Sequence, residues 1–324
     1  MKPLIVNADY DDVLHGGKPD QRRVVAVECV AMWFLKAPLR VHRFYPESFL
    51  DYVEEFTGHR PQLLNRGEGE NWWGALKQPE LERELNSKLW AHLWWKPRWN
   101  LEGEICRTVD DVTRVLTNGK TAVLKRAHAM SGRGNKKMTQ ADWAKDSAQF
   151  ESWLTQGLVA EPFYQRVSDL SALWLPGEKR FIYYRNQIDD RFQWRGVVLE
   201  NGGEPIFSSE ELSAMGEWKK LLLQLAQDIE AKGYLGPFSV DAFFYLEEDR
   251  LKFHPCSEVN ARKTMGWMAL ELWKKDRPSW CKLWLEPLKL NETEWARQHQ
   301  TIAQDVWLLS PPDSPFVWYW SERA

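Results

Sequence analysis

Residues 236–266 constrain this chain more than any other stretch, because a strand-like run there is followed by closely spaced oxygen-bearing side chains. Residues 238–245 are rich in aromatic and β-branched side chains, as strands are. Residues 250–262 form a second run, and the acidic residues 247–249 between the two predict a tight turn. Because strand side chains alternate between faces, one face of the first strand is apolar and Asp241 lies on the other. The apolar face consists of Phe238, Val240, Ala242 and Phe244.

The second strand of this hairpin carries three polar residues at i, i+2 and i+4, which alternation places on one face. They are Glu258, Asn260 and Arg262. We expect the hairpin to close at residues 248–249. In that register Asp241 lies opposite Cys256 and diagonal to Glu258, roughly 7–8 Å away, which is close enough to share a bound ion.

The chemistry of this cluster indicates a magnesium polyphosphate. Two carboxylates and an amide oxygen are hard ligands that suit Mg²⁺ better than zinc. Mg²⁺ is usually held by one or two carboxylates together with substrate phosphates. Arg262 can fork onto phosphate oxygens. The alternative is a solvent-exposed hairpin face that carries a surface ion pair and binds no ligand. The alternation of side chains alone does not distinguish a magnesium site from such a face.

At these residues the chain resembles the ATP-grasp superfamily. The metal-binding signature of that family runs from a glycine through an acidic residue and a hairpin to Glu-x-Asn-x-Arg. It stands here as Gly236, Asp241, Glu258, Asn260 and Arg262. The resemblance implies that Asp241, Glu258 and Asn260 hold one or two Mg²⁺ ions, or Mn²⁺ in their place, on ATP. It also implies that Arg262 contacts the terminal phosphates and acts in catalysis.

Composition places the chain among ordinary globular proteins. It has 324 residues and a formal net charge of −3, without the clustered basic surface of a nucleic-acid-binding protein. Its four cysteines are scattered without a CxxC pair, which favours reduced thiols and a cytoplasmic location. We expect no signal peptide, and no membrane span is expected from the apolar run 24–35, which Glu28 interrupts. The 20 tryptophans suggest either an aromatic substrate groove or core packing, and their spread along the chain favours packing.

Residues 1–85 predict a small α/β unit. An apolar run at 4–6 ends in a polar loop, a pattern typical of the ligand edge of an open α/β sheet. The acidic residues of that loop are Asp9, Asp11 and Asp12. Residues 24–27 and 41–45 are candidate further strands, and 46–56 are expected to form a helix. In ATP-grasp proteins such a unit often helps to bind the non-nucleotide substrate, which this loop could face; a solvated turn is the favoured alternative.

Two lysines and a glycine-containing loop form the next candidate site. A helix is predicted over residues 80–92 and carries Lys88, and a strand over 120–126 carries Lys125. The strand runs into a loop over 127–135 whose glycines let the backbone approach phosphates, although it matches neither a Walker A loop nor GxGxxG. The ATP-grasp resemblance implies that Lys88 binds a phosphate and that Lys125, also a catalytic candidate, meets the α-phosphate. It further implies a lid over the β- and γ-phosphates formed by Ser131, Gly132 and Gly134. An exposed helix lysine and an ordinary hairpin loop are the alternatives.

Residues 158–164 predict a strand that ends in an acidic hinge. The ATP-grasp resemblance implies that backbone groups of such a hinge pair with adenine, and Asp169 follows at a distance suited to the ribose hydroxyls. The matching residues are Glu161, Phe163 and Tyr164. Pro162 removes one backbone donor from this segment. A core strand leaving its sheet at a proline is the alternative interpretation.

These observations together predict an α/β protein with an ATP-grasp fold in three parts. We expect a pre-ATP-grasp unit over residues 1–85 and a lid over 86–160. Residues 161–324 would hold the metal site and a helical tail that begins after Gly266 and continues to about Leu309.

The resemblance implies an ATP- and Mg²⁺-dependent ligase that activates a carboxylate as an acyl phosphate for attack by an amine or similar nucleophile. Its partners would be ATP and a small carboxylate or peptide, without nucleic acid or membrane. An ATP-dependent phosphotransferase and a non-catalytic ATP-binding protein are the alternatives. Neither the substrate nor the oligomeric state follows from the sequence.

Overall fold

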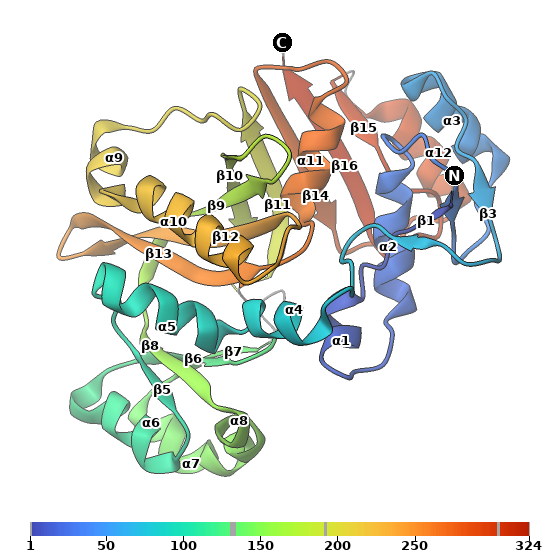
Figure 1. The fold of residues 1–324 in the computed structure, drawn as a ribbon. Helices are drawn as coiled ribbons and strands as arrows, with labels where there is room; N and C mark the ends of the chain where they lie inside the picture. Colours follow the sequence, from blue (N-terminus) through green and yellow to red (C-terminus); the bar gives the residue numbers. More distant parts are fainter. Residues whose placement is uncertain (1, 130–133, 191–192, 303–304, 324) are drawn as a thin grey trace.

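In the computed structural model, which describes residues 2–129, 134–190, 193–302 and 305–323, three sheets follow one another along the chain. A parallel sheet of four short strands comes first, then an antiparallel sheet of four strands, and last an antiparallel sheet of eight. Figure 1 shows the first sheet on the right in blue and the second at the bottom, below the large sheet. The mixed α/β fold predicted from the sequence is confirmed.

The first sheet has the strand order β3-β2-β1-β4, with all pairs parallel. Its strands are β1 (Leu4–Ile5), β2 (Leu39–Arg40), β3 (Leu63–Leu64) and β4 (Glu70–Asn71). The accompanying helices are α1 (Tyr10–Leu14), α2 (Gln21–Ala31) and α3 (Glu47–Thr57). Helix α3 confirms the helix predicted over 46–56, and it ends at Gly58, whose φ of 72° closes the last turn.

Two expected strands of this unit are wrong. Residues 24–27 lie inside α2, because Asp20 caps the helix by accepting a hydrogen bond from the backbone N–H of Arg23 and the valines bury on one side. Tertiary packing there overrides the strand preference of valine. Residues 41–45 lie beyond β2, and the N–H of His42 donates to the buried carboxylate of Glu28 at 3.1 Å instead of to a strand.

The second sheet has the order β5-β8-β6-β7. Its strands are β5 (Glu104–Cys106), β6 (Ala122–Arg126), β7 (Asn135–Met138) and β8 (Leu158–Pro162). Its helices are α6 (Val109–Leu116), α7 (Gln140–Asp146) and α8 (Glu151–Gln156), with short 3₁₀ turns η1 (Thr117–Gly119) and η2 (Ser147–Phe150). Both α6 and α7 begin with a capping box, at Thr108 and Thr139, and the unit has its own hydrophobic cluster.

Two helices join the first sheet to the second, where the sequence predicted one over 80–92. They are α4 (Pro79–Leu85) and α5 (Lys88–Trp99). The break lies at Ser87, whose hydroxyl accepts from the backbone N–H of Leu89 and so caps a new helix. As a result Lys88 is the first residue of α5, not a residue in the middle of a helix.

The third sheet has the order β13-β12-β9-β10-β11-β14-β16-β15. Its strands are β9 (Gln165–Leu175), β10 (Arg180–Ile188), β11 (Trp194–Glu200), β12 (Phe238–Glu247), β13 (Arg250–Asn260), β14 (Trp280–Glu286), β15 (Val306–Leu308) and β16 (Val317–Arg323). The helices are α9 (Ser209–Met215), α10 (Trp218–Ala231), α11 (Met265–Trp273) and α12 (Glu292–Thr301).

The expected helical tail after Gly266 is therefore wrong. Two helices are present, but β14 and β15 lie in the same stretch and β16 closes the chain. In β14 the buried Cys281 and Leu283 alternate with the less buried Lys282 and Trp284, which is the period of a strand.

The two faces of the eight-stranded sheet bury separate hydrophobic clusters. On one face α5 and α10 pack against β9, β12 and β13, with Trp95, Trp218 and Phe238 fully buried. On the other face α11 and the N-terminal unit pack against β10, β11, β14 and β16. Trp33 of the N-terminal unit donates a hydrogen bond to the carbonyl of Leu309 at 3.0 Å, so the two ends of the chain share one core.

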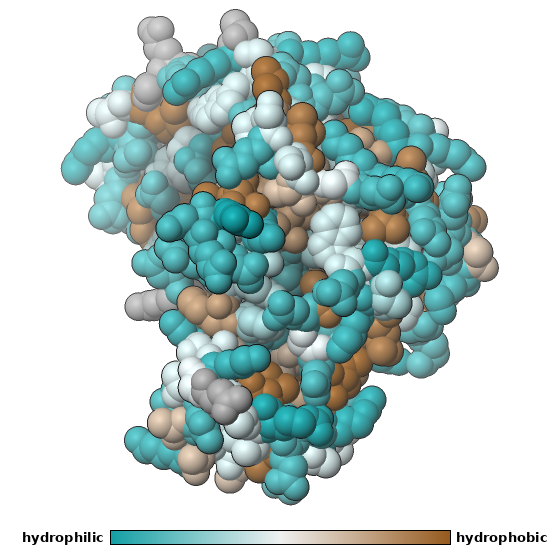
Figure 2. All heavy atoms as spheres, turned by 90° about the vertical axis from the view of Figure 1, so that its left-hand side faces the viewer, coloured by the Kyte–Doolittle hydropathy of each residue, from teal (hydrophilic) through white to brown (hydrophobic). Residues whose placement is uncertain are grey.

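On the side drawn in Figure 2, hydrophilic atoms predominate, and hydrophobic atoms form separate groups, some of them on the smaller lower lobe. In the described part of the chain no helix is long and apolar enough to cross a bilayer.

Candidate active site

The hairpin β12–β13 brings two carboxylates face to face. It closes through Glu248 and Asp249, both with positive φ (48° and 59°), as a tight two-residue turn requires. Asp241 lies directly opposite Glu258. Simple counting placed it opposite Cys256, which is wrong because the register shifts by a β-bulge immediately after Asp241. The bulge therefore makes the carboxylate pair closer than the sequence predicts.

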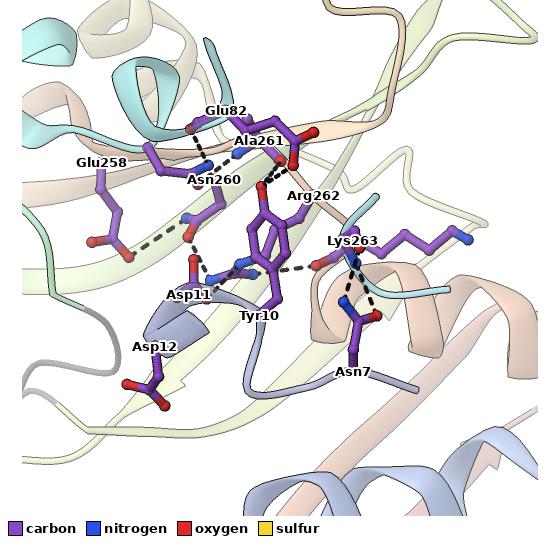
Figure 3. Close-up of polar contacts among 12 residues, drawn as sticks. Asn7, Tyr10, Asp11, Asp12, Glu82, Glu258, Asn260, Ala261, Arg262 and Lys263 are labelled. Carbon is purple, nitrogen blue, oxygen red and sulfur yellow. Dashed lines mark hydrogen bonds and ion pairs between the residues drawn. The ribbon is translucent and has the colours of Figure 1, made fainter. Parts of the chain in front are cut away.

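Asn260 connects the two carboxylates with an arginine. Its Nδ2 donates to Asp241 Oδ2 at 3.0 Å. Figure 3 shows its other two contacts, in which Nδ2 lies 3.5 Å from Glu258 Oε1 and Oδ1 accepts from Arg262 Nη2 at 2.9 Å. Lys88 Nζ lies 2.5 Å from Glu258 Oε2. In this arrangement Asn260 presents nitrogen, not oxygen, to the carboxylates, so ligation of a metal by its oxygen requires the amide to turn.

The surroundings shift the pKa values of the two carboxylates in opposite directions. Burial, and after it the charge of Glu258, raises the pKa of Asp241 well above its ordinary value. Burial also acts to raise the pKa of Glu258, but Lys88 and Arg262 outweigh it and the net shift is downward. A divalent cation between the two side chains would relieve this repulsion, and hard oxygen ligands fit Mg²⁺.

The described residues contain no cluster of three or more His, Cys, Asp or Glu side chains able to enclose a metal on their own. Two carboxylates are consistent with a cation that takes its remaining ligands from water and from phosphate.

The segment after β13 is held by the N-terminal unit. Arg262 Nε forms an ion pair with Asp11 Oδ2 at 2.7 Å, and the backbone N–H of Ala261 donates to Asn86 Oδ1 at 2.9 Å. The N–H of Lys263 donates to the carbonyl of Trp73 at 3.0 Å. Figure 3 shows these side chains meeting around the end of the strand. The favoured solvated-turn interpretation of the acidic loop is therefore wrong for Asp11, which is buried and holds Arg262.

The two lysines are buried in ion pairs. Lys125 is 2% exposed, and its Nζ lies 2.5 Å from Glu161 Oε2. Glu161 is also 3.5 Å from His254 Nε2 and 4.0 Å from His92 Nδ1. Burial would raise the pKa of Glu161, but the charge of Lys125 and its hydrogen bond to the carboxylate outweigh burial and lower the pKa. Burial lowers the pKa of His254 to about 3, so this imidazole is neutral. Sequence reasoning missed His254, which carries no motif and is brought here only by the hairpin.

A cavity of about 520 Å³ lies against the carboxylate pair. Its wall includes five of the residues that carry the predicted chemistry. They are Asp169, Asp241, Glu258, Asn260 and Arg262. Asp11 of α1, Arg23 of α2 and Asn135 of β7 also line it, so all three sheet units contribute to its wall. Lys88, Lys125 and Glu161 are outside the lining.

No protein-family model and no curated protein matches the chain. Solved structures do match it. The biotin carboxylase domain of 2-oxoglutarate carboxylase from Hydrogenobacter thermophilus has a TM-score of 0.52 and 13% identity, and the match covers 89% of this chain and 70% of that one. N5-carboxyaminoimidazole synthetase from Staphylococcus aureus has a TM-score of 0.52 and 9% identity, with 99% and 92% covered. Rhizobium etli pyruvate carboxylase has a TM-score of 0.52 and 12% identity, with 94% and 30% covered.

The chain has the ATP-grasp fold. Identities this low establish the architecture and leave the roles of individual residues to be argued from this chain.

The predicted adenine hinge of this ATP-grasp fold is closed. The backbone N–H of Phe163 donates to the carbonyl of Thr121 at 2.9 Å, and Lys137 Nζ lies 3.8 Å from the centre of the Phe163 ring. The ring of Tyr164 packs 4.3 Å from that of Tyr245. Neither Phe163 nor Tyr164 lines the cavity. The Phe163 N–H and the Tyr164 ring, both expected to meet adenine, are therefore engaged by other groups of the protein in this structure.

The predicted phosphate lid is only partly described. Ser131 and Gly132 lie outside the described residues. At Gly134 a Cβ atom would meet Ala129 Cβ at 2.1 Å, so only glycine fits. The carbonyl of Gly134 accepts from the N–H of Arg126 at 2.8 Å, which joins β6 to β7 at the base of the loop.

Asp169 has a partner of its own. Its Oδ1 accepts from Arg166 Nη1 at 2.7 Å, and both residues line the cavity. Asp169 thus lies near the carboxylate pair, which sequence spacing alone could not show.

Proposed function

We propose that this protein is an ATP- and Mg²⁺-dependent ligase that activates a carboxylate as an acyl phosphate for attack by an amine or a similar nucleophile. The observation that carries the proposal is the Asp241–Glu258 pair on the wall of the cavity, next to Arg262, in an ATP-grasp fold. The similar biotin carboxylase domain from Hydrogenobacter thermophilus was solved with MgADP and bicarbonate. That complex supports an adenine nucleotide and Mg²⁺ as the ligands. We propose that Mn²⁺ can replace Mg²⁺.

The proposed reaction has two steps. A carboxylate oxygen of the substrate attacks the γ-phosphorus of ATP, the bond from that phosphorus to the ADP oxygen breaks, and an acyl phosphate forms. The nitrogen of an amine then attacks the acyl carbon, the carbon–oxygen bond to phosphate breaks, and the amine loses a proton. Products are ADP, phosphate and an amide.

Residues of this chain act mainly by binding and by stabilising charge. Asp241 and Glu258 would hold Mg²⁺, whose chemistry is to neutralise charge on the phosphates. Arg262 would contact the transferred phosphoryl group with its remaining donors while Asp11 holds its position. Cation binding would release Lys88 from Glu258, so that its ammonium group becomes available to a phosphate. Lys125 would meet the α-phosphate in the same way after leaving Glu161.

The first test measures nucleotide binding. We expect a clear rise in melting temperature with Mg²⁺ and a non-hydrolysable ATP analogue, since a ligand at about 100-fold excess over its Kd stabilises the native state by about 2.7 kcal/mol. Mn²⁺ should give a similar rise. An unchanged melting temperature at millimolar nucleotide contradicts the proposal.

The second test measures turnover with a panel of carboxylic acids and hydroxylamine as the acceptor. A ligase forms a hydroxamate and releases ADP and phosphate in equal amounts. A phosphotransferase releases ADP without phosphate, and a non-catalytic ATP-binding protein binds nucleotide and releases neither.

Glu258→Gln separates metal-dependent chemistry from binding. Because the metal matters most as charge develops in the transition state, we expect ADP release to fall at least about 100-fold while nucleotide affinity changes much less. Glu247→Gln is the matched control, because Glu247 is an exposed carboxylate at the tip of the same hairpin. Wild-type turnover by Glu258→Gln would refute the metal assignment.

A further inference from the structure

The cavity does not end at the carboxylate pair but continues across one face of the large sheet to an aromatic end. Asp241 is opposite Ser171, and Ser171 is opposite Tyr184 on β10. Further along β10, Ile188 is opposite Trp194 of β11, so Trp194 shares this face. Trp318 of β16 and Phe316 complete the far wall. The lining is therefore formed by carboxylates near β12 and β13, whereas aromatic rings join it near β11 and β16, beside Gln193 and Arg195.

A chain of three hydrogen bonds fixes the geometry between the two ends. Trp194 Nε1 donates to Asn186 Oδ1 at 3.1 Å, Asn186 Nδ2 donates to Ser171 Oγ at 2.5 Å, and Ser171 Oγ donates to Asp241 Oδ1 at 2.5 Å. The three hydrogen-bond lengths and the width of the Asn186 amide group set an upper limit on the distance between the two ends. Trp194 Nε1 therefore lies within about 10 Å of the Asp241 carboxylate. The indole is anchored by its polar edge, as buried tryptophans usually are.

The aromatic end is a space between a tryptophan wall and small side chains. The rings of Trp194 and Trp318 lie 5.9 Å apart at 43°. The wall opposite includes Ala26 and Val27 of α2, whose short side chains leave room over the sheet. Trp318 is 2% exposed, and its Nε1 finds no hydrogen-bond acceptor among the described residues.

Charged groups also line the cavity near this end, and two of the arginines there have carboxylate partners, whereas Arg22 of α2 has none among the described residues. Arg195 is held by Asp189 at 2.7 Å, and Arg23 by Asp12 at 2.7 Å. A ligand that fits both ends must carry an anion for the polar end and an apolar, flat group for the aromatic end.

We propose that the acid activated at this site is an aromatic carboxylic acid, with its ring a few bonds from the carboxylate and packed against Trp194 and Trp318. The inference rests on the proposed ligase function, because that function places the carboxylate of the substrate beside Asp241 and Glu258. It changes the role of two tryptophans from packing to substrate selection.

The test compares two series of acids that differ only in their terminal group. Phenylacetate, 3-phenylpropanoate and 4-phenylbutanoate form the aromatic series, and acetate, butanoate and hexanoate form the aliphatic series. Affinities are measured by calorimetry in the presence of Mg²⁺ and the ATP analogue, and ADP release is measured with ATP and hydroxylamine. We expect the best aromatic acid to bind about tenfold more tightly than the best aliphatic acid and to give the highest kcat/KM.

Three variants assign the preference to the aromatic wall. Trp194→Ala should reduce the aromatic-to-aliphatic ratio of affinities about tenfold, mainly through KM in the turnover assay. Trp194→Phe retains a ring but loses the hydrogen bond to Asn186. This variant should keep most of the preference for aromatic over aliphatic acids. Trp153→Ala is the matched control, since this half-buried tryptophan lies in the lid cluster away from the cavity, and its ratio should equal that of the wild type.

The outcomes separate this inference from the proposed function. Equal binding of the two series, or a ratio unaffected by Trp194→Ala in a folded variant, overturns the inference. If the ATP analogue still raises the melting temperature and an aliphatic acid still yields hydroxamate, the ligase proposal stands. Tight binding of an aromatic acid without any ADP release supports the aromatic site and refutes the ligase.

Discussion

The ion pair between Lys125 and Glu161 gives the sharpest test of how this site is held together. Both side chains are at least 95% buried and their charged atoms are 2.5 Å apart. Lys125→Met keeps the length of the side chain and removes its charge, which leaves Glu161 buried without its main partner. Breaking a buried pair by removing one member costs about 3–5 kcal/mol, because an uncompensated charge remains. At about 2–4 °C per kcal/mol, the melting temperature should fall by about 6–20 °C.

A second substitution shows whether the loss comes from the charge. Glu161→Gln added to Lys125→Met removes the stranded carboxylate, so the double variant should recover most of the lost stability. Thermal melts of the wild type, both single variants and the double variant form the complete cycle. If Lys125→Met alone loses less than about 1 kcal/mol, or the double variant melts as low as the single one, the charge argument is refuted.

The pH dependence of the same variant has a definite sign. In the wild type the pKa of Glu161 is lowered, so its contribution to stability is present above its ordinary value of 4.5 and is lost as the pH falls below it. In Lys125→Met, burial raises the pKa of Glu161, and protonation then relieves the unpaired charge. The stability difference between wild type and variant should therefore shrink as the pH is lowered toward 4.5. The folded double variant should also bind nucleotide at least about tenfold more weakly, because a charge-assisted contact of about 1.5–3 kcal/mol is missing.

Two further predictions concern the N-terminal unit. Asp11→Asn should lower kcat about tenfold, because Arg262 loses the carboxylate that holds it. Asp12→Asn, which changes the partly exposed neighbouring aspartate, should not lower kcat. Equal kcat values in the two variants would contradict this prediction. The stacked rings of His15 and His128 are 4.0 Å apart, and burial followed by nearby positive charges lowers the pKa of each from 6.5 to about 4. The unfolded chain therefore binds more protons between these values, so the melting temperature should drop as the pH falls from 6.5 to 4. Replacing both histidines with glutamine should make this fall in melting temperature smaller. An unchanged fall between pH 6.5 and 4 would show that the two histidines do not cause it.

The sequence predicted the hairpin and its chemistry because alternation over ten residues is a strong local signal. It predicted the buried face of β12 and the closing turn correctly. It could not show the β-bulge after Asp241, since a bulge depends on the partner strand as much as on local residues. It could not show the pairing of Asp11 with Arg262 either, because 251 positions separate two residues that no pattern connects.

The roles of the lysines were harder to predict for a different reason. A strand lysine and a hinge glutamate each suggested a contact with ATP, but no sequence pattern shows that the two residues neutralise each other. Whether they also bind nucleotide remains a prediction. The split between α4 and α5 was missed because the leucine spacing continues across the break, whereas the cap at Ser87 depends on one hydroxyl.

The shared core of the two chain ends has a consequence for synthesis. Trp33 donates to the carbonyl of Leu309, 276 positions later, and the aromatic side chains around it pack with residues from the last strand. Residues 1–85 therefore cannot cover this apolar face until residues 306–323 have also been made. Contacts this distant in sequence slow folding and leave intermediates exposed to aggregation. We expect the nascent chain to depend on chaperones that bind apolar segments, and residues 1–85 expressed alone to remain insoluble.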